Sequence, residues 1–408
     1  MGIDLKQSTN SKQSSSGNSD KQAIVYIITK LELGGAQKVC LSLFKGVQER
    51  GETASLITGA QGALVDAVAH TPHTIFLDEL KREVSFRYVW LEIKTFQRLI
   101  IILRDLKKEH PQLVVHTHST KAGLLGRWAA FFAGVKRRVH TIHGYGFHDH
   151  QPFILWFSIY FLELITSFIT THYVCVSSED VKIGLRLIPN FGKKYSVIRA
   201  AVDAQFFFVP ARQDSLFPEQ GKPFVFGTIS CFKKQKNIWD LLRAFEHVYQ
   251  KNSNIRLEII GDGVLRKDIE GWIMKHHLSS VITLHGWQNN VAPFLMNWHA
   301  FVLSSLWEGL PCSIIEARLM KLPILSYNTG GIPDVIFSGE NGLLYPKGNW
   351  RELAQGMFTL THQPQLYTKL QTFQDDFTEF STSAMVEHHI QLYRSLEKRF
   401  GPKIQLHE

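Results

Sequence analysis

Cysteine is scarce in this chain of 408 residues, and its four copies lie far apart. No Cys-x-x-Cys pair and no metal-ligand spacing occurs among Cys40, Cys175, Cys231 and Cys312. The pattern argues against a disulfide-stapled domain and a cysteine-based zinc site. It predicts reduced, buried thiols in a cytoplasmic protein.

Several other signals are missing. No apolar run reaches the ~20 residues that a membrane-spanning helix needs, and the first twenty residues lack the apolar core of a secretory signal. Lys6 stands where N-myristoylation of Gly2 would need Ser or Thr, so we reject that modification. The G-x-G-x-x-G dinucleotide fingerprint is absent. His148-Asp149-His150 has no evident third ligand, which favours a polar acceptor-side loop over a metal site.

The composition is that of a soluble globular protein, with 44% hydrophobic and 20% charged residues. The length suits two domains of ordinary size. A formal net charge of +9 indicates an anionic partner. Nucleic acid, an anionic membrane leaflet and a phosphorylated substrate are the candidates.

Apolar runs alternate with stretches of helical period, which predicts an α/β protein with parallel sheets. The most informative stretch is residues 300–326, where a buried strand, a loop, a helix and a second strand follow one another. Glu308 lies in the loop at the carboxyl end of the first strand, and Glu316 lies on the helix behind Pro311, which we place in its first turn. Ligands bind at this edge of open α/β sheets, and a helix start attracts phosphate. Two carboxylates beside a phosphate site suit a nucleotide-sugar enzyme.

Glu308-x7-Glu316, with Gly309-Leu310-Pro311 behind the first glutamate, resembles the signature of the retaining glycosyltransferases of family 4. Two further motifs of that family follow in order, at residues 330–334 and 341–344. The resemblance covers nearly all of residues 23–395 and is densest in the second half. It implies the GT-B fold, in which two Rossmann-like domains enclose a cleft.

On this basis we divide the chain into five parts. They are a disordered tail at 1–22, an N-terminal acceptor domain at 23–208, a linker at 209–222, a C-terminal nucleotide-sugar domain at 223–378, and a helix at 379–400 that crosses back to the first domain. Residues 197–203 resemble the family's boundary strand. Ala200-Ala201 stands there in place of the family's usual Asn-Gly.

Three further motifs resemble donor-binding elements of the family, and each also has a plainer interpretation. Gly34-Gly35 resembles the donor-phosphate loop, although a tight turn needs the same glycines. His143-Gly144 resembles the family's His-Gly beside the donor sugar, although a histidine bonded to nearby backbone would look the same. Lys236 matches the lysine that binds the donor diphosphate, although a solvated charge run is the alternative.

The family's arginine before that lysine is Cys231 here, so we expect Lys233 to supply the second charge. The resemblance further implies that Glu308 binds the donor sugar, that Glu316 accepts hydrogen bonds from the ribose, and that His143 orients the sugar. No metal or other cofactor is implied, since lysines and a helix start can stabilise the diphosphate and no Asp-x-Asp motif occurs.

The sequence thus predicts a hexosyltransferase that moves sugar from a nucleotide diphosphate to a glycan or lipid-linked acceptor, in surface polysaccharide or lipopolysaccharide assembly. A nucleotide-sugar epimerase of the same fold and a non-catalytic sugar or nucleic-acid binder remain alternatives, and a glycosidase is the weakest. We expect no nucleic-acid partner, because the aromatic residues follow no RNP-type pattern.

Residues 153–169 are the most apolar region, interrupted by Glu163. Two interpretations stay open. An aromatic-rich helix on a basic domain can lie in a membrane interface, on the inner face of the plasma membrane, and reach a lipid-linked acceptor there. A plain buried helix fits the pattern equally well.

Overall fold

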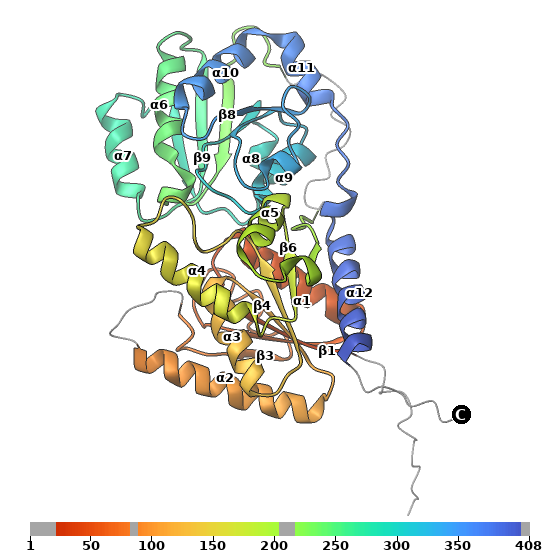
Figure 1. The fold of residues 1–408 in the computed structure, drawn as a ribbon. Helices are drawn as coiled ribbons and strands as arrows, with labels where there is room; N and C mark the ends of the chain where they lie inside the picture. Colours follow the sequence, from red (N-terminus) through yellow and green to blue (C-terminus); the bar gives the residue numbers. More distant parts are fainter. Residues whose placement is uncertain (1–21, 82–88, 204–216, 401–408) are drawn as a thin grey trace, which may run out of the picture.

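The computed structural model describes residues 22–81, 89–203 and 217–400. Within these ranges two parallel sheets form two stacked lobes (Figure 1). The first sheet holds β1 (Ala23–Ile28), β2 (Thr53–Thr58), β3 (Thr74–Phe76), β4 (Val114–His118), β5 (Arg137–Ile142), β6 (His172–Cys175) and β7 (Tyr195–Val197). The second holds β8 (Phe224–Ile229), β9 (Ile255–Ile260), β10 (Ile282–Gly286), β11 (Ala300–Leu303), β12 (Ile324–Tyr327) and β13 (Gly342–Tyr345).

Both sheets are doubly wound. Their strand orders are β3-β2-β1-β4-β5-β6-β7 and β10-β9-β8-β11-β12-β13. In each sheet the order reverses beside the first strand, between β1 and β4 and between β8 and β11. Ligands of such sheets bind outside the carboxyl ends of the strands at this switch point. The predicted α/β architecture of two Rossmann-like domains is confirmed.

Helices cover both sheets and connect the strands. The first lobe carries α1 (Gly35–Glu49), α2 (Val89–Glu109), α3 (Thr120–Phe132), α4 (Phe153–Ser167) and α5 (Ser178–Leu187). The later helices are α6 (Ile238–Tyr249), α7 (Arg266–Lys275), α8 (Ala292–Leu295), α9 (Cys312–Leu319), α10 (Trp350–His362), α11 (Pro364–Thr372) and α12 (Thr382–Phe400). Short 3-10 turns lie at Phe191–Lys193, Lys234–Lys236, Ile332–Asp334 and Thr378–Phe380.

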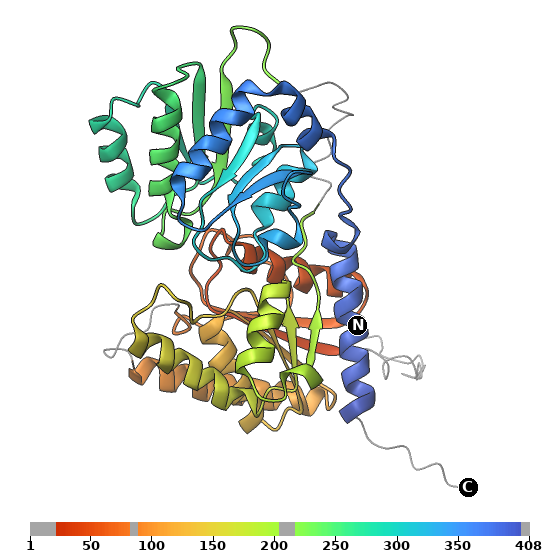
Figure 2. The same cartoon turned by 45° about the horizontal axis from the view of Figure 1, so that its top comes forward.

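The last helix belongs spatially to the first lobe. Figure 2 shows α12 running alongside that lobe, where it packs against α1 and β5. Tyr393 on α12 is buried, and its hydroxyl lies 2.6 Å from Nδ1 of His116 and 3.2 Å from the hydroxyl of Tyr26. The core of the first lobe is therefore completed by residues from the far end of the sequence.

The boundary strand and one cysteine differ from what the sequence predicts. The strand expected over 197–203 is wrong beyond Val197, where β7 ends, although Val202 still forms an isolated bridge with Ser381. Cys231 is partly exposed, unlike the other three cysteines, which are buried as expected. The tail and most of the linker lie outside the described residues, so the domain boundaries stay predictions.

Helix α4 buries polar side chains and exposes apolar ones, the reverse of an ordinary surface helix. Its buried side chains are the polar Glu163, Thr166 and Ser167. Its apolar side chains face outward, with 74% of Phe153 and 79% of Ile154 exposed. The interpretation of this segment as a buried core helix is therefore wrong. In the described ranges, no helix combines the length and apolarity required to cross a membrane.

A buried ion pair holds α4 in this orientation. Both carboxylate oxygens of Glu163 accept from the guanidinium of Arg127 on α3, at 2.8 and 2.7 Å. Tyr173 donates to the same carboxylate at 3.1 Å, and Arg127 donates further to Thr170 at 2.9 Å. Such a pair is costly to break, because either partner alone is a buried, uncompensated charge.

We expect Glu163→Gln to lower the free energy of unfolding by about 3–5 kcal/mol, since it leaves the guanidinium of Arg127 buried without its counter-charge. Urea unfolding followed by circular dichroism measures this loss. The matched control is Asp105→Asn, which breaks the exposed pair with Lys108 and should cost less than about 1 kcal/mol. Equal losses in the two variants would show that the buried pair does not anchor α4.

Candidate functional site

The loops that leave the two switch points face each other across the junction of the lobes. The loop after β1 carries Gly34 and leads into α1, and the loop after β5 carries His143. From the second lobe come the turn after β8, with Lys236, and the loop after β11, with Glu308. Doubly wound topology thus brings residues more than 200 positions apart in the sequence to one crevice.

An ion pair lies at the centre of this crevice. The Nζ atom of Lys236 is 2.5 Å from Oε1 of Glu308, and both side chains are largely buried. Burial disfavours the charged ammonium, but the attraction and hydrogen bond of Glu308 outweigh it and raise the pKa of Lys236. Lys236 is therefore a fixed positive charge at neutral pH. Two residues predicted from separate motifs lie in direct contact.

Two helix starts meet beside this pair. Gly34 and Pro311 are the N-cap residues of α1 and α9, so Pro311 precedes its helix and does not occupy the first turn as expected. A Cβ atom added to Gly35 would lie 3.5 Å from Sγ of Cys312, which places the two starts side by side. Among the described residues no side chain caps either start, so backbone N–H groups are available to an anion.

The second carboxylate of the signature faces a cation from the other lobe. Glu316 is buried in α9, and its Oε1 lies 3.5 Å from Nζ of Lys38 on α1. Sequence reasoning assigned no role to Lys38. Its position three residues after Gly35, in the first turns of the helix behind the glycine loop, is the signal that could have identified it.

Glycines allow the two lobes to touch backbone to backbone. A Cβ atom on Gly309 would lie 2.5 Å from the backbone carbonyl atoms of His143, and one on Gly144 would lie 3.3 Å from the backbone nitrogen of Gly309. Gly330 has φ of +56°, and a Cβ there would overlap the carbonyl oxygen of Glu308. Side chains at Gly309 or Gly144 would push the Glu308 loop away from the His143 loop, and a side chain at Gly330 would displace the Glu308 loop within the second lobe. Leu310, the next residue of the signature, packs in the hydrophobic core.

His143 is held by a second histidine. Its Nε2 lies 3.0 Å from Nδ1 of His118, which is buried on β4. Burial, followed by the nearby His389, lowers the pKa of His143 to about 4. The imidazole is thus neutral at physiological pH, and one ring nitrogen is committed to His118.

Lys233, the residue expected to supply a second charge, pairs across the junction of the lobes. Its side chain is partly exposed, and its Nζ lies 3.6 Å from Oε2 of Glu32 in the loop before α1. It therefore joins the two lobes next to the Gly34-Gly35 loop, whereas Lys236 is the lysine that pairs with Glu308.

A further interlobe contact was not anticipated. Asp334, at the end of the Gly-Gly-x-Pro-Asp motif, accepts from the backbone nitrogen of Ser178 at 2.7 Å and from Arg199 at 2.5 Å. It also accepts from the hydroxyl of Ser178. Arg199 and Asp334 each lie in a motif that the sequence analysis recognised, but the sequence gave no reason to pair them. In the described part of the chain, no group of three or more His, Cys, Asp or Glu side chains could hold a metal ion.

Family models match both lobes. Residues 33–206 match the model described as Glycosyltransferase Family 4, and residues 212–374 match Glycosyl transferases group 1. An Escherichia coli protein, UDP-Gal:alpha-D-GlcNAc-diphosphoundecaprenol alpha-1,3-galactosyltransferase, is 32% identical over 307 residues, which are 73% of this chain and 77% of the relative. The Staphylococcus aureus capsular polysaccharide biosynthesis glycosyltransferase CapM is 24% identical over 70% of this chain and 75% of its own length.

Solved structures share the fold. The Anabaena protein HepE in complex with UDP-glucose superposes with a TM-score of 0.75 at 17% identity, over 91% of this chain and 99% of that structure. The lipopolysaccharide outer core galactosyltransferase WaaB gives a TM-score of 0.64 at 18% identity, with coverage of 92% and 100%. With both lobes matched and a relative above 30% identity over most of its length, this chain belongs to the family 4 glycosyltransferases of GT-B fold.

Proposed function

We propose that this glycosyltransferase moves a hexose, with retention of configuration, from a UDP-sugar to a lipid-linked saccharide during surface polysaccharide or lipopolysaccharide assembly. The observation that carries the proposal is the Lys236–Glu308 pair, which lies at the switch point of the second sheet beside two uncapped helix starts. The name of the E. coli relative supports the donor and acceptor classes, and that of the S. aureus relative supports surface polysaccharide assembly.

The cationic side of the site would stabilise the leaving group. Negative charge grows on the nucleoside diphosphate as the bond to the sugar breaks, and fixed positive charges placed there in advance lower the barrier. Lys236, the start of α1 at Gly34-Gly35 and the start of α9 behind Pro311 supply such charge. Lys233 adds a second ammonium from the rim, although it cannot reproduce the two-pronged contact of an arginine.

The anionic side would handle the sugar and the ribose. Glu308, paired with Lys236, would accept from donor sugar hydroxyls and lie near the ring where positive charge develops. Glu316, oriented by Lys38, would accept from the ribose hydroxyls. A neutral His143 would donate or accept a hydrogen bond at the sugar without adding positive charge beside a cationic ring.

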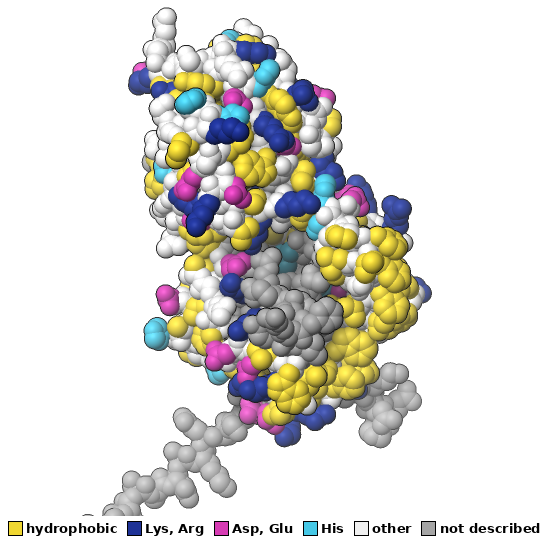
Figure 3. Space-filling view, turned by 90° about the vertical axis from the view of Figure 1, so that its left-hand side faces the viewer, with side chains coloured by type: hydrophobic (Ala, Val, Ile, Leu, Met, Phe, Trp, Pro, Cys, Tyr) yellow, Lys and Arg dark blue, Asp and Glu magenta, His cyan; other side chains and the backbone are white. Residues whose placement is uncertain are grey.

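The acceptor side of the proposal rests on the apolar face of the first lobe. Figure 3 shows apolar side chains gathered over this lobe. They come from α4, α3 and the residue after α4, and the large exposed ones are Phe131, Phe132, Phe153, Ile154, Leu155, Phe157, Phe161, Leu162, Ile165 and Phe168. Rings of Phe153, Phe157 and Phe161 stack in succession along α4.

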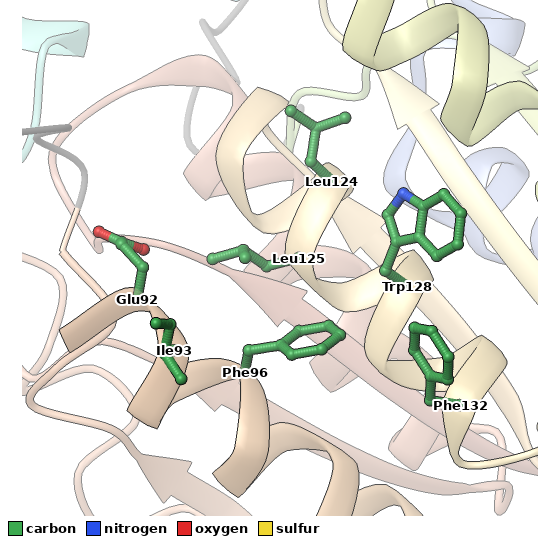
Figure 4. Close-up of a pocket in the computed structure, with 7 residues that line it drawn as sticks. All are labelled: Glu92, Ile93, Phe96, Leu124, Leu125, Trp128 and Phe132. Atoms are coloured by element: carbon green, nitrogen blue, oxygen red, sulfur yellow. The ribbon is translucent and has the colours of Figure 1, made fainter. Parts of the chain in front are cut away.

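The same face continues into a groove between α2 and α3. In Figure 4, Ile93 and Phe96 of α2 face Leu125, Trp128 and Phe132 of α3, around a cavity of about 480 Å³. Large aromatic and aliphatic side chains on one face of a cationic protein are typical of interfacial membrane binding. We therefore propose that this face docks on the anionic inner leaflet of the plasma membrane, where a lipid-linked acceptor is presented.

An epimerase of the same fold remains the alternative activity. An epimerase would convert the UDP-sugar without an acceptor, whereas a transferase releases UDP in step with an acceptor. UDP release measured with and without a lipid-linked saccharide separates the two.

We expect Lys236→Ala and Glu308→Ala each to lower kcat by about 100- to 1,000-fold, because each removes charge aimed at the transition state. Acceptor-dependent UDP release measures the loss. Lys222→Ala is the matched control, since Lys222 forms an exposed pair with Glu219 on the same lobe. Undiminished turnover of either crevice variant, with the control also active, would contradict the assignment of the site.

We expect the protein to float with vesicles that contain about one third anionic lipid, and to lose most of this binding in Phe157→Glu/Phe161→Glu. The charges remove apolar contacts and repel an anionic surface. Phe337→Glu, which changes an exposed aromatic residue on the second lobe, is the control and should float like the wild type. Wild-type protein that stays at the bottom of the gradient would count against membrane docking.

A further inference from the structure

A stack of three rings joins the lobes next to the carboxylate pair. His148 and His150 lie in the loop between β5 and α4, and Trp307 immediately precedes Glu308. The ring centroids of His148 and Trp307 are 3.9 Å apart with an interplanar angle of 22°. Those of His150 and Trp307 are 5.1 Å apart at 23°. The histidine pair, which the sequence analysis assigned to a polar acceptor-side loop, is stacked on an indole of the other lobe.

Each side of the stack is held by its own lobe. On the histidine side, Gln151 accepts from the backbone nitrogen of His148 at 3.2 Å and donates to the carbonyl of Gly146 at 2.9 Å. On the indole side, Gln235 donates to the carbonyl of Trp307 at 2.9 Å. Gln235 is the residue before Lys236. The stack therefore connects the His143–Gly144 loop, through Trp307, to both members of the carboxylate–lysine pair.

We propose that His148 and His150 are positioning residues that clamp Trp307, and through it the loop carrying Glu308, against the first lobe. This inference rests on the proposed function, because it assigns the clamp to the same crevice. The histidines touch neither Glu308 nor Lys236 themselves. They fix the backbone from which Glu308 projects, in the region where Gly309 meets Gly144 without side chains between them.

The charges around the clamp favour neutral rings. The pKa of His148 is lowered by burial first and then by His150; Asp149 opposes this lowering, while Lys234 and Lys347 of the second lobe add to it. Protonation would place positive charge on His148 facing those two lysines. The clamp is therefore fully formed above the ~6.5 of an ordinary imidazole, and it weakens as the pH falls below that value.

The first test is a substitution series at His148. We expect His148→Ala to lower kcat/KM by about 2- to 12-fold, the range that one aromatic pair supports, with most of the loss in kcat. His148→Phe keeps a ring against Trp307 and should restore the rate. Phenylalanine cannot be protonated, so in a plot of kcat/KM against pH this variant should lose less activity at acid pH than the wild type. The ratio of variant to wild-type kcat/KM should therefore rise below pH 6.5.

The chain contains a matched control for loss of a stacked ring. His276, the C-cap residue of α7, stacks on Trp272 of that helix with the same centroid distance of 3.9 Å, outside the crevice. His276→Ala should leave kcat/KM within twofold of the wild type. A loss of activity in this control as large as that in His148→Ala would show that stacking matters only for general stability and would overturn the clamp.

A double-mutant cycle supplies the second test. If His148 acts through Trp307, the losses caused by His148→Ala and Trp307→Ala should be less than additive, while His276→Ala and Trp307→Ala should add. Additive losses at His148 and Trp307 would overturn the proposal. Full activity of His148→Ala would also overturn the proposal if Lys236→Ala is inactive in the same assay. If Lys236→Ala is itself active, the result refutes the proposed function instead.

Discussion

The contact between Lys236 and Glu308 is the interaction on which the site depends. A buried ammonium and a buried carboxylate each cost free energy when alone, and together they form a compensated pair that can exist inside a crevice. The switch point of the second sheet, between β8 and β11, brings them together, and the glycines at 309 and 330 let the surrounding backbone approach closely enough to enclose them. The helix starts at Gly34 and Pro311 then face a place where one positive charge is already fixed.

Much of this arrangement could be predicted from the sequence, because periodicity and glycine–proline motifs are local signals. The strand, loop, helix and second strand expected over residues 300–326 are observed as β11, α9 and β12, in that order. Glu308 and Lys236 were selected from separate motifs. Their contact could not be derived, since it requires the relative placement of two strands in a folded sheet.

What the sequence could not give is pairing across the lobes. Lys38 resembles any lysine on an amphipathic helix until α9 is placed beside it. Asp334 belongs to a recognisable motif, but its partners Ser178 and Arg199 lie in the other half of the chain. For helix α4 the sequence left an interfacial and a buried helix open, because apolar content alone does not say which side faces the core. The contacts of Glu163 with Arg127 and Tyr173, which hold the polar side inward, become visible only in the fold.

The position of α12 has a consequence for how the polypeptide is made. Tyr393 completes a buried network with His116 and Tyr26, and β1 and β4 belong to the first third of the sequence. During synthesis the strands of the first lobe are made before α12, so His116 and Tyr26 lack the hydroxyl of Tyr393 until that helix has been translated. A first lobe produced without α12 would therefore have an incomplete core, even though every strand of its sheet is present.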